Sequence, residues 1–372
     1  MAVIGIAGGG QLGRMLTEAA HALGHTVVIL DPTENSPAGQ VADEQIIGDF
    51  KEESMMFALA AKCDVVTYEI EAVNTEALVK IAQSGKPVHP TPKTLGIIRD
   101  KLQQKIFFME HGINTAQFVE VSNEREGVRA GEILGYPFIV KARTGGFDGR
   151  GNAIVQNESD IWSAMSLLGP KLYGERLIKF DKELAVIAAR TVKGEVAIYA
   201  LTETVHQDHI CQLTMTPADV TIGAAEKAYV LARQALRALE GAGVFGIEMF
   251  LTGNEVLVNE ISPRVHNSGH WTIEGCETSQ FEQHIRTITG MPLGPINTKA
   301  QAAVTINILG NRDAPAEPKG IEDAEKVQNV KVHIYGKAQT RVKRKMGHLT
   351  ALGESLEAAK ASAQIARAYI SI

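Results

Sequence analysis

Residues 1 to about 90 alternate short apolar runs with helical patterns, and this alternation constrains the fold more than any other feature of the sequence. The apolar runs cover residues 2–7, 26–30 and 65–68, and the helical patterns cover residues 11–23 and 75–83. Short apolar runs separated by helices are typical of parallel strands, because each parallel connection must cross back over the sheet. The pattern therefore predicts an N-terminal domain, residues 1–95, built on a parallel sheet.

The chain of 372 residues has room for further domains, and its pattern changes along the way. A helix over 95–110 leads into a small unit, residues 96–178, which carries a glycine-rich loop. Residues 179–300 form a unit with longer strands, and residues 301–372 form a C-terminal subdomain that a helix over 354–369 closes. Strands are expected at 136–141, 152–156, 183–190, 196–204, 243–251, 255–261, 303–309 and 330–335, and helices at 226–240 and 280–288. The predicted fold class is multidomain, mixing α/β and α+β.

Composition and charge narrow the class of protein. A net charge of −6 disfavours a nucleic-acid partner, because phosphate backbones are neutralised by a surplus of Lys and Arg. Cys63, Cys211 and Cys276 show no CxxC spacing, which argues against a disulfide framework. No apolar stretch reaches the roughly 18 residues of a membrane span, and the N-terminus lacks a signal-peptide pattern. We therefore expect a cytoplasmic enzyme that contacts neither nucleic acid nor membrane.

A glycine cluster follows the first predicted strand. Gly8, Gly10 and Gly13 match GxGxxG between a strand and a helix, and Asp31 ends the next strand. Glycines permit a tight turn, and the free N–H groups of a helix N-terminus attract an anion. Three interpretations stay open from this motif alone: a nicotinamide or flavin dinucleotide site, a site for phosphate or another ligand, and a turn with only a structural purpose.

Two acidic residues lie on the arms of a predicted β-hairpin. The apolar runs around Glu248 and Glu260 flank a turn signal at Gly253 and Asn254. A three-residue loop over 253–255 would set the two carboxylates opposite each other, with Cβ atoms about 5 Å apart, whereas a two-residue loop would place them on opposite faces. Facing carboxylates repel unless a cation or proton lies between them, and oxygen ligands suit Mg²⁺ shared with nucleotide phosphates. The alternative is one solvated acid and one paired with a local base.

The glycine-rich loop over 142–151 follows a lysine at a strand end. Lys141, Arg143 and Arg150 place positive charge around glycines whose backbone N–H groups are accessible. This combination favours a cover for polyphosphate, although it is not a Walker motif. An ordinary surface turn is the alternative.

Two more polar segments are candidates for binding. Residues 262–271 combine Arg264, which could brace a developing negative charge, with His266 and His270. No Cys or acid joins these histidines at zinc-ligand spacing, so a polar active-site loop is favoured over a zinc site. Residues 341–348 hold five basic residues, His348 among them, which form either a solvated face or a patch for a substrate phosphate.

Together these stretches resemble the N5-carboxyaminoimidazole ribonucleotide synthetases, an ATP-grasp family of de novo purine synthesis. The resemblance runs over essentially the whole chain. The matching segments are residues 8–14, 68–71, 144–152, 259–260, 263–270 and 345–348. It implies an ATP-grasp fold with a Rossmann-like N-terminal domain, a lid (residues 96–178), a large domain with the ATP and Mg²⁺ site (179–300) and a small C-terminal subdomain.

The family's functional residues carry over wherever the motifs match. The implied ATP contacts are Lys101, Lys141, Gly146, Phe147, Asp148, Gly149, Arg150, Gly151, Asn152, Glu175, Arg176, Leu177, Ile178, Glu183, His206, Asn259 and Glu260. The implied Mg²⁺ ligands are Glu248 and Glu260. The implied contacts of aminoimidazole ribonucleotide are Glu69, Asp148, Arg150, Arg344 and Lys345, and the implied catalytic residues are Arg264, His266, Asp148 and Lys345. Ser262 departs from the metal-binding Asn of many ATP-grasp enzymes, which puts a third protein ligand in doubt.

The resemblance also implies the reaction: ATP, bicarbonate and 5-aminoimidazole ribonucleotide give ADP, phosphate and the N5-carbamate, by way of carboxyphosphate. Asp148 would orient the amine or take its proton. A homodimer is the expected assembly. The alternatives are a nicotinamide-dependent oxidoreductase, a non-catalytic ATP-binding regulator, and another ATP-grasp ligase such as a biotin carboxylase.

Overall fold

The computed structural model describes residues 1–146 and 151–372. Its N-terminal domain holds β1 (Val3–Ala7), α1 (Gln11–Ala22), β2 (Thr26–Asp31), β3 (Glu44–Ile47), α2 (Glu53–Ala61), β4 (Val65–Tyr68) and α3 (Thr75–Gln83). The strands pair in the order β3-β2-β1-β4, and every pairing is parallel, as predicted. The sequence pattern missed β3, which is half polar, and α2, whose apolar residues surround the helix and so show no helical period.

The helix predicted over 95–110 is wrong as a single element. It is two helices, α4 (Pro92–Arg99) and α5 (Lys101–Glu110), which meet at Asp100. Asp100 has an extended backbone, with φ −93° and ψ 105°, and its side chain accepts hydrogen bonds from the N–H groups of Leu102 and Gln103. Asp100 therefore ends one helix and caps the next, and this fixes the position of Lys101 at the first turn of α5.

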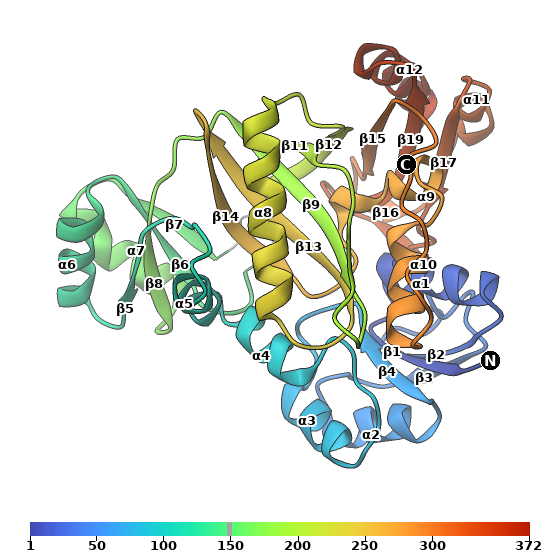
Figure 1. Ribbon diagram of the computed structural model, residues 1–372, viewed down its shortest axis with the longest axis horizontal. Helices are drawn as coiled ribbons and strands as arrows, with labels where there is room; N and C mark the ends of the chain where they lie inside the picture. Colours follow the sequence, from blue (N-terminus) through green and yellow to red (C-terminus); the bar gives the residue numbers. More distant parts are fainter. Residues whose placement is uncertain (147–150) are drawn as a thin grey trace.

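The lid is a four-stranded antiparallel sheet with two helices, at the left of Figure 1. Its elements are β5 (Phe118–Val121), α6 (Glu124–Leu134), β6 (Phe138–Ala142), β7 (Asn152–Val155), a 3-10 turn (Glu158–Asp160), α7 (Ile161–Leu168) and β8 (Leu172–Arg176). The strand order is β5-β8-β6-β7. The predicted strands on either side of the glycine loop are confirmed as β6 and β7, which pair with each other.

The large domain and the C-terminal subdomain share one nine-stranded sheet. Its order is β14-β13-β9-β11-β12-β15-β19-β17, with β10 beside β9. The large-domain elements are β9 (Lys182–Arg190), β10 (Val196–Ile198), β11 (Thr202–Gln207), β12 (Ile210–Thr216), α8 (Ile222–Ala238), β13 (Gly243–Thr252), β14 (Glu255–Ser262), η2 (Asn267–Gly269), α9 (Thr272–Gly275) and α10 (Gln280–Ile288). The C-terminal elements are β15 (Ala302–Leu309), β16 (Ala314–Pro315), α11 (Ile321–Glu325), β17 (Val330–Ile334), β18 (Gln339–Thr340), β19 (Lys345–Gly353) and α12 (Leu356–Tyr369).

The strand predicted over 196–204 is split in the structure. β10 and β11 both pair with β9, and residues 199–201 lie between them. Tyr199 in this interruption is buried, and its hydroxyl donates to the carbonyl of Thr278 at 3.0 Å. The apolar pattern could not distinguish this buried crossing from a continuous strand, because both bury the same residue types.

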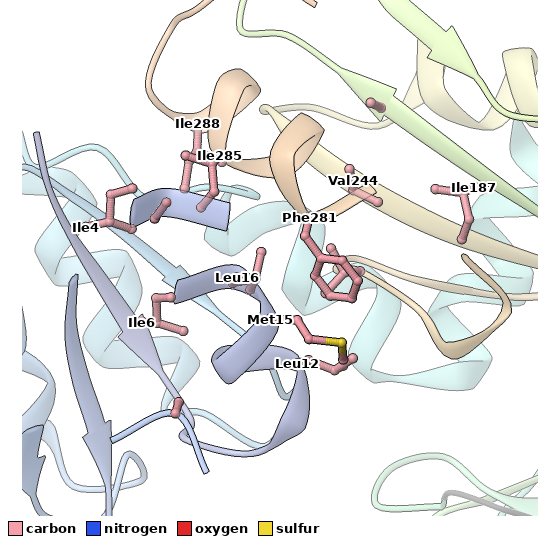
Figure 2. Close-up of a cluster of buried hydrophobic side chains, with 14 of the residues drawn as sticks. Ile4, Ile6, Leu12, Met15, Leu16, Ile187, Val244, Phe281, Ile285 and Ile288 are labelled. Atoms are coloured by element: carbon pink, nitrogen blue, oxygen red, sulfur yellow. The ribbon is translucent and has the colours of Figure 1, made fainter. Parts of the chain in front are cut away.

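A shared hydrophobic core joins the N-terminal domain to the large domain. Figure 2 shows α1 and α10 packed together, with Leu12 and Met15 facing Phe281. Ile187 of β9 and Val244 of β13 belong to the same cluster. Because this core spans two sheets, the N-terminal domain is held against the large domain by apolar packing. Among the described residues, no helix has the length and apolar character needed to cross a bilayer.

Candidate functional site

The hairpin of β13 and β14 places Glu248 and Glu260 opposite each other, as predicted, but its turn and its register differ from those expected. The turn is the two-residue Gly253-Asn254 type, since Thr252 pairs with Glu255, so the three-residue loop was wrong. A bulge then shifts the register by one residue, because Glu248 pairs with Glu260 whereas Met249 pairs with Val258. Asn259 is the extra residue, and it returns both carboxylates to one face.

The two carboxylates form a coupled pair at the edge of the large sheet. Their side chains are only 25% and 33% exposed. Burial and the nearby Glu260 raise the pKa of Glu248. Burial would also raise the pKa of Glu260, but the ammonium of Lys101, 2.5 Å from Oε2, outweighs it and lowers that pKa. Two neighbouring, partly buried carboxylates with a cation on one side offer a divalent ion both negative charge and oxygen ligands.

Lys141 and Glu175 meet inside the lid. Lys141 Nζ lies 3.2 Å from Glu175 Oε1, and their strands β6 and β8 are neighbours. Lys141 also pairs in register with Asn152, at the start of β7. The predicted glycine Gly151 has φ +84°, and its carbonyl accepts from the N–H of Ala142 at 2.8 Å. Lys141 therefore lies where the two ends of the glycine loop come together.

Of the other predicted ATP residues, those that the structure describes lie in the lid, in the connection that follows it, or in the large domain. Gly146 is half-buried at the other end of the described loop, and Arg176, Leu177 and Ile178 continue from Glu175 into the connection toward the large domain. Glu183 of β9 and His206 of β11 form an ion pair through Oε2 and Nδ1. Burial would lower the pKa of His206, but Glu183 outweighs it and the pKa is raised. Phe147, Asp148, Gly149 and Arg150 lie outside the described residues.

The segment after β14 folds back over the acid pair. His266 Nε2 lies 3.5 Å from Glu248 Oε1, and its Nδ1 lies 2.9 Å from the hydroxyl of Ser268. Burial, then Arg264 and Lys345, lowers the pKa of His266 to about 3, so the ring is neutral near pH 7. Arg264 forms an ion pair with Glu71, with Nε 2.9 Å from Oε1. This places a neutral imidazole beside Glu248, and the guanidinium of Arg264 next to that imidazole.

His270, the second histidine of the segment, is buried and packs against His348 at a ring distance of 4.6 Å. The prediction that His348 belongs to a basic surface patch is wrong. His348 is fully buried, and this burial holds its pKa well below the ordinary value. Its strand β19 runs inside the sheet and is buried over most of its length. Within the described ranges, no three or more His, Cys, Asp or Glu residues are grouped so that they could hold a metal ion.

The other basic residues of this run lie at or near the surface. Lys343 pairs with Asp208, 2.9 Å between Nζ and Oδ2, and Arg344 Nη1 donates to the carbonyl of Gln339 at 2.7 Å. Lys345 begins β19 and is half-buried, close enough to His266 to lower its pKa. The patch therefore has basic residues at its surface, with Lys345 on the side of His266.

The N-terminal glycine cluster is occupied by side chains of the protein itself. The N–H groups of Gly10 and Gly13 donate to the two oxygens of Glu69, at 2.5 and 2.6 Å, and the N–H of Gly9 donates to Asp31 at 2.7 Å. The helix N-terminus and the acid that a dinucleotide would use are thus both engaged. Glu69 follows β4 and therefore sits at the end of the parallel sheet that faces this turn.

Sequence reasoning missed two buried polar residues of the site. Lys105 is 3% exposed and lies 3.3 Å from Glu175. Gln280, at the start of α10, accepts from the N–H of His266 and donates to its carbonyl, at 2.9 and 2.7 Å. The only available signal was a polar residue on an apolar helix face, which does not reveal a partner far away in the sequence.

Three known domain families match the chain. The ribonucleotide synthetase preATP-grasp domain matches residues 1–99, the ATP-grasp domain residues 106–281, and the phosphoribosylaminoimidazole carboxylase C-terminal domain residues 303–362.

Similar curated proteins fall into a longer and a shorter group. The phosphoribosylaminoimidazole carboxylase of Ogataea methanolica is 42% identical over 95% of this chain and 67% of its own length, and that of Schizosaccharomyces pombe is 42% identical over 95% and 65%. The chain thus spans about two thirds of these longer relatives. The N5-carboxyaminoimidazole ribonucleotide synthase of Brucella melitensis is 40% identical over 93% of this chain and 95% of its own length.

Solved structures agree with this grouping. N5-carboxyaminoimidazole ribonucleotide synthetase from Thermotoga maritima has a TM-score of 0.90 and 42% identity, and covers 100% of this chain and 99% of its own. The enzyme from Aspergillus clavatus, solved with ADP and 5-aminoimidazole ribonucleotide, has a TM-score of 0.90 and 39% identity, and covers 98% and 97%.

Proposed function

From the premise that this chain belongs to the N5-carboxyaminoimidazole ribonucleotide synthase family of ATP-grasp ligases, we propose that it carboxylates 5-aminoimidazole ribonucleotide with bicarbonate at the expense of ATP. The observation that carries the proposal is the Glu248–Glu260 pair, which contacts Lys101 on one side and His266 on the other. We also propose that the protein forms a homodimer and is located in the cytoplasm.

We propose that the nucleotide lies between the lid and the edge of the large sheet. Lys101 and Lys141 would contact its phosphates, since ammonium groups neutralise phosphate charge. The connection from Glu175 to Ile178 would border the base, and Glu183 with His206 the ribose. Gly146, Gly151 and Asn152 would bring backbone N–H groups to the polyphosphate. Asn259, the bulged residue of β14, directly precedes Glu260 and would complete the nucleotide site.

The acid pair fits Mg²⁺ on the chemistry of its donor set. Two oxygen ligands from the protein leave positions for phosphate oxygens and water, which is the usual way that Mg²⁺ is held at nucleotide sites. When bound, the ion would offset negative charge on the phosphoryl group that is transferred. Its charge would also counter the burial and the repulsion from Glu260 that together raise the pKa of Glu248.

The residues beside the acid pair suit a carboxyl transfer in two steps. A bicarbonate oxygen attacks the γ-phosphorus and ADP leaves, giving carboxyphosphate; the amine of the ribonucleotide then attacks the carboxyl carbon, phosphate leaves, and the amine gives up its proton. Arg264 would stabilise negative charge on bicarbonate, and the neutral His266 can hydrogen-bond to the same group. Glu69, Arg344 and Lys345 would contact the ribonucleotide, as would Asp148 and Arg150.

The proposed function predicts a specific pattern of ADP release. Purified protein with Mg·ATP should release ADP rapidly only when bicarbonate and 5-aminoimidazole ribonucleotide are both present, because the activated carboxyl group needs its acceptor to complete turnover. A coupled assay for ADP, with each component omitted in turn, measures this directly. Rapid ADP release that ignores the ribonucleotide, or that needs a different amine, would rule out the assigned acceptor.

A second prediction concerns the placement of His266. A Cβ at Gly246 would lie 2.5 Å from Cβ of His266, so Gly246→Ala should push the segment 262–271 away from the acid pair. We expect kcat to fall by about 10- to 100-fold, the scale of a misplacement near 1 Å, with little change in ADP affinity. Steady-state kinetics and calorimetric titration with ADP measure both. Gly223→Ala on α8, where a Cβ meets nothing within 4 Å, is the matched control and should keep full activity. Equal activity of the two variants would contradict the role given to His266.

A further inference from the structure

A buried lysine that the proposed site does not use lies between the four-stranded sheet of the lid and the large domain. Lys105 is on α5, one helical turn after Lys101, and its side chain is 3% exposed. Its Nζ lies 3.3 Å from Glu175 Oε2 and donates to the hydroxyl of Thr115 at 2.8 Å. Burying a lysine costs free energy that its partners must offset, so removing a partner would be strongly destabilising.

Lys105 reaches both halves of the nucleotide site. On one side Glu175 belongs to β8 of the lid. On the other side the hydroxyl of Thr115 donates to the carbonyl of Val258 at 2.7 Å, and Val258 lies on β14, two residues before Glu260. A single ammonium group therefore connects the lid sheet to the strand of the acid pair.

Two lysines at the start of α5 connect this helix to carboxylates of both domains. Lys101 and Lys105 are four residues apart and so lie on one face of the helix. Lys101 pairs with Glu260 of the large domain, and Lys105 pairs with Glu175 of the lid. A shift of α5 would thus move one carboxylate contact in each domain at the same time.

The charges around Glu175 show what Lys105 changes. Glu175 is 2% exposed and faces two ammonium groups, Lys105 and Lys141, at 3.3 and 3.2 Å. Burial would raise the pKa of Glu175, but these two lysines outweigh it and the pKa is lowered, so the acid stays charged. Burial lowers the pKa of Lys105 to about 8, so Lys105 is mostly charged near pH 7 and the trio keeps one surplus positive charge. If Lys105 were neutral, Glu175 would be balanced by Lys141 alone, and Lys141 would have no surplus charge for a phosphate.

We propose that Lys105 is a positioning residue for the nucleotide: it neutralises Glu175, so that the charge of Lys141 remains available to the phosphates, and it ties β8 of the lid to β14 of the large domain. The inference deepens the proposed function and rests on it, because it assumes that ATP lies between these two elements. It predicts that loss of the Lys105 charge weakens nucleotide binding without affecting the ribonucleotide.

The test compares four variants of the full-length chain: Lys105→Met, Lys105→Arg, the double variant Lys105→Met with Glu175→Gln, and Lys93→Met. Lys93 is the control, since it pairs with Glu240 on the surface and is 68% exposed. Calorimetry gives the Kd for ADP, and steady-state assays give KM for ATP and for the ribonucleotide. Circular dichroism verifies the fold of each variant.

We expect Lys105→Met to raise the Kd for ADP and the KM for ATP by about 10- to 100-fold, as displaced phosphate contacts would. The KM for the ribonucleotide should stay within about twofold, and Lys93→Met should behave as the unmodified chain. Lys105→Arg should restore most of the affinity because it keeps the charge. The double variant should bind ADP more tightly than Lys105→Met, because the neutral amide that Glu175→Gln introduces no longer competes for the charge of Lys141.

Other outcomes would overturn the inference. An unchanged Kd for ADP in Lys105→Met would do so, and so would a double variant that binds no better than Lys105→Met, because only packing would then be involved. If Lys105→Met does not fold, Lys105→Arg and the double variant are each compared with the unmodified chain, and a Kd for ADP raised by about tenfold or more in both would overturn the inference. Failure of the proposed function would look different: the unmodified chain would bind ADP but show no ADP release that depends on bicarbonate and the ribonucleotide.

Discussion

Replacing Glu260 by Gln should reduce turnover by about three orders of magnitude or more, while the chain stays folded. The variant keeps the shape of the side chain but loses the charge that pairs with Lys101 and, with Glu248, would hold the ion. An ion that neutralises a transferred phosphoryl group contributes several kcal/mol, and about 1.4 kcal/mol corresponds to a factor of ten in rate. ADP release with all substrates present measures the loss.

The control for this prediction lies on the same hairpin. Glu255 is exposed and pairs with Lys227, so Glu255→Gln removes one carboxylate from β14 without touching the acid pair. It should leave turnover within about twofold, as is usual for a surface ion pair. Raising the Mg²⁺ concentration should recover part of the activity of Glu260→Gln if Glu248 still supplies a ligand. Normal turnover of Glu260→Gln at limiting Mg²⁺ would remove the assignment of this pair to the cation.

The acid pair also shows how far sequence reasoning reaches. The pairing of Glu248 with Glu260 could be predicted because apolar runs and a turn signal define a hairpin. The reason could not be predicted, because two compensating features produce it: a two-residue turn and a bulge at Asn259. A bulge depends on which backbone groups the neighbouring strand leaves unpaired, and a single sequence does not contain that information.

Local patterns failed wherever burial depended on distant elements. Asp100 reads as one more polar residue in a long helix, yet it caps α5 and accepts a bidentate contact from Arg143. His348 reads as basic, yet strands on both sides bury it. Lys105 and Gln280 were missed for the same reason, since their partners lie 70 and 14 residues away, at Glu175 and His266.

The N-terminal glycines illustrate a motif that the chain itself satisfies. GxGxxG predicts free N–H groups at a helix start, and the sequence left open what anion they bind. In the structure that anion is Glu69, which follows β4 at the end of the same sheet. Burial raises the pKa of Glu69, although the two N–H groups oppose this. From the motif alone, a dinucleotide site, a site for another ligand and a structural turn all stayed open, and the family resemblance, rather than the motif, identified the enzyme.

The largest effect on stability is expected at the core that joins the N-terminal and large domains. Phe281 on α10 is 2% exposed, and Figure 2 shows its ring beside Met15 and Leu12 of α1. Phe281→Ala should lower the free energy of unfolding by about 3–5 kcal/mol, the usual cost of removing a buried aromatic ring and leaving a cavity. Urea unfolding followed by circular dichroism measures this change.

Phe281→Ala should also reduce activity under conditions where the variant is folded. Gln280, the neighbouring residue, holds both backbone groups of His266, and the Phe281 ring packs 5.7 Å from the ring of His270. A cavity at this point would loosen the start of α10, and the segment beside the acid pair would lose its support. Phe180→Ala is the matched control, because Phe180 is 43% exposed and stacks on Phe250 away from α10. A loss of stability no greater than that of Phe180→Ala would mean that the two domains are held together elsewhere.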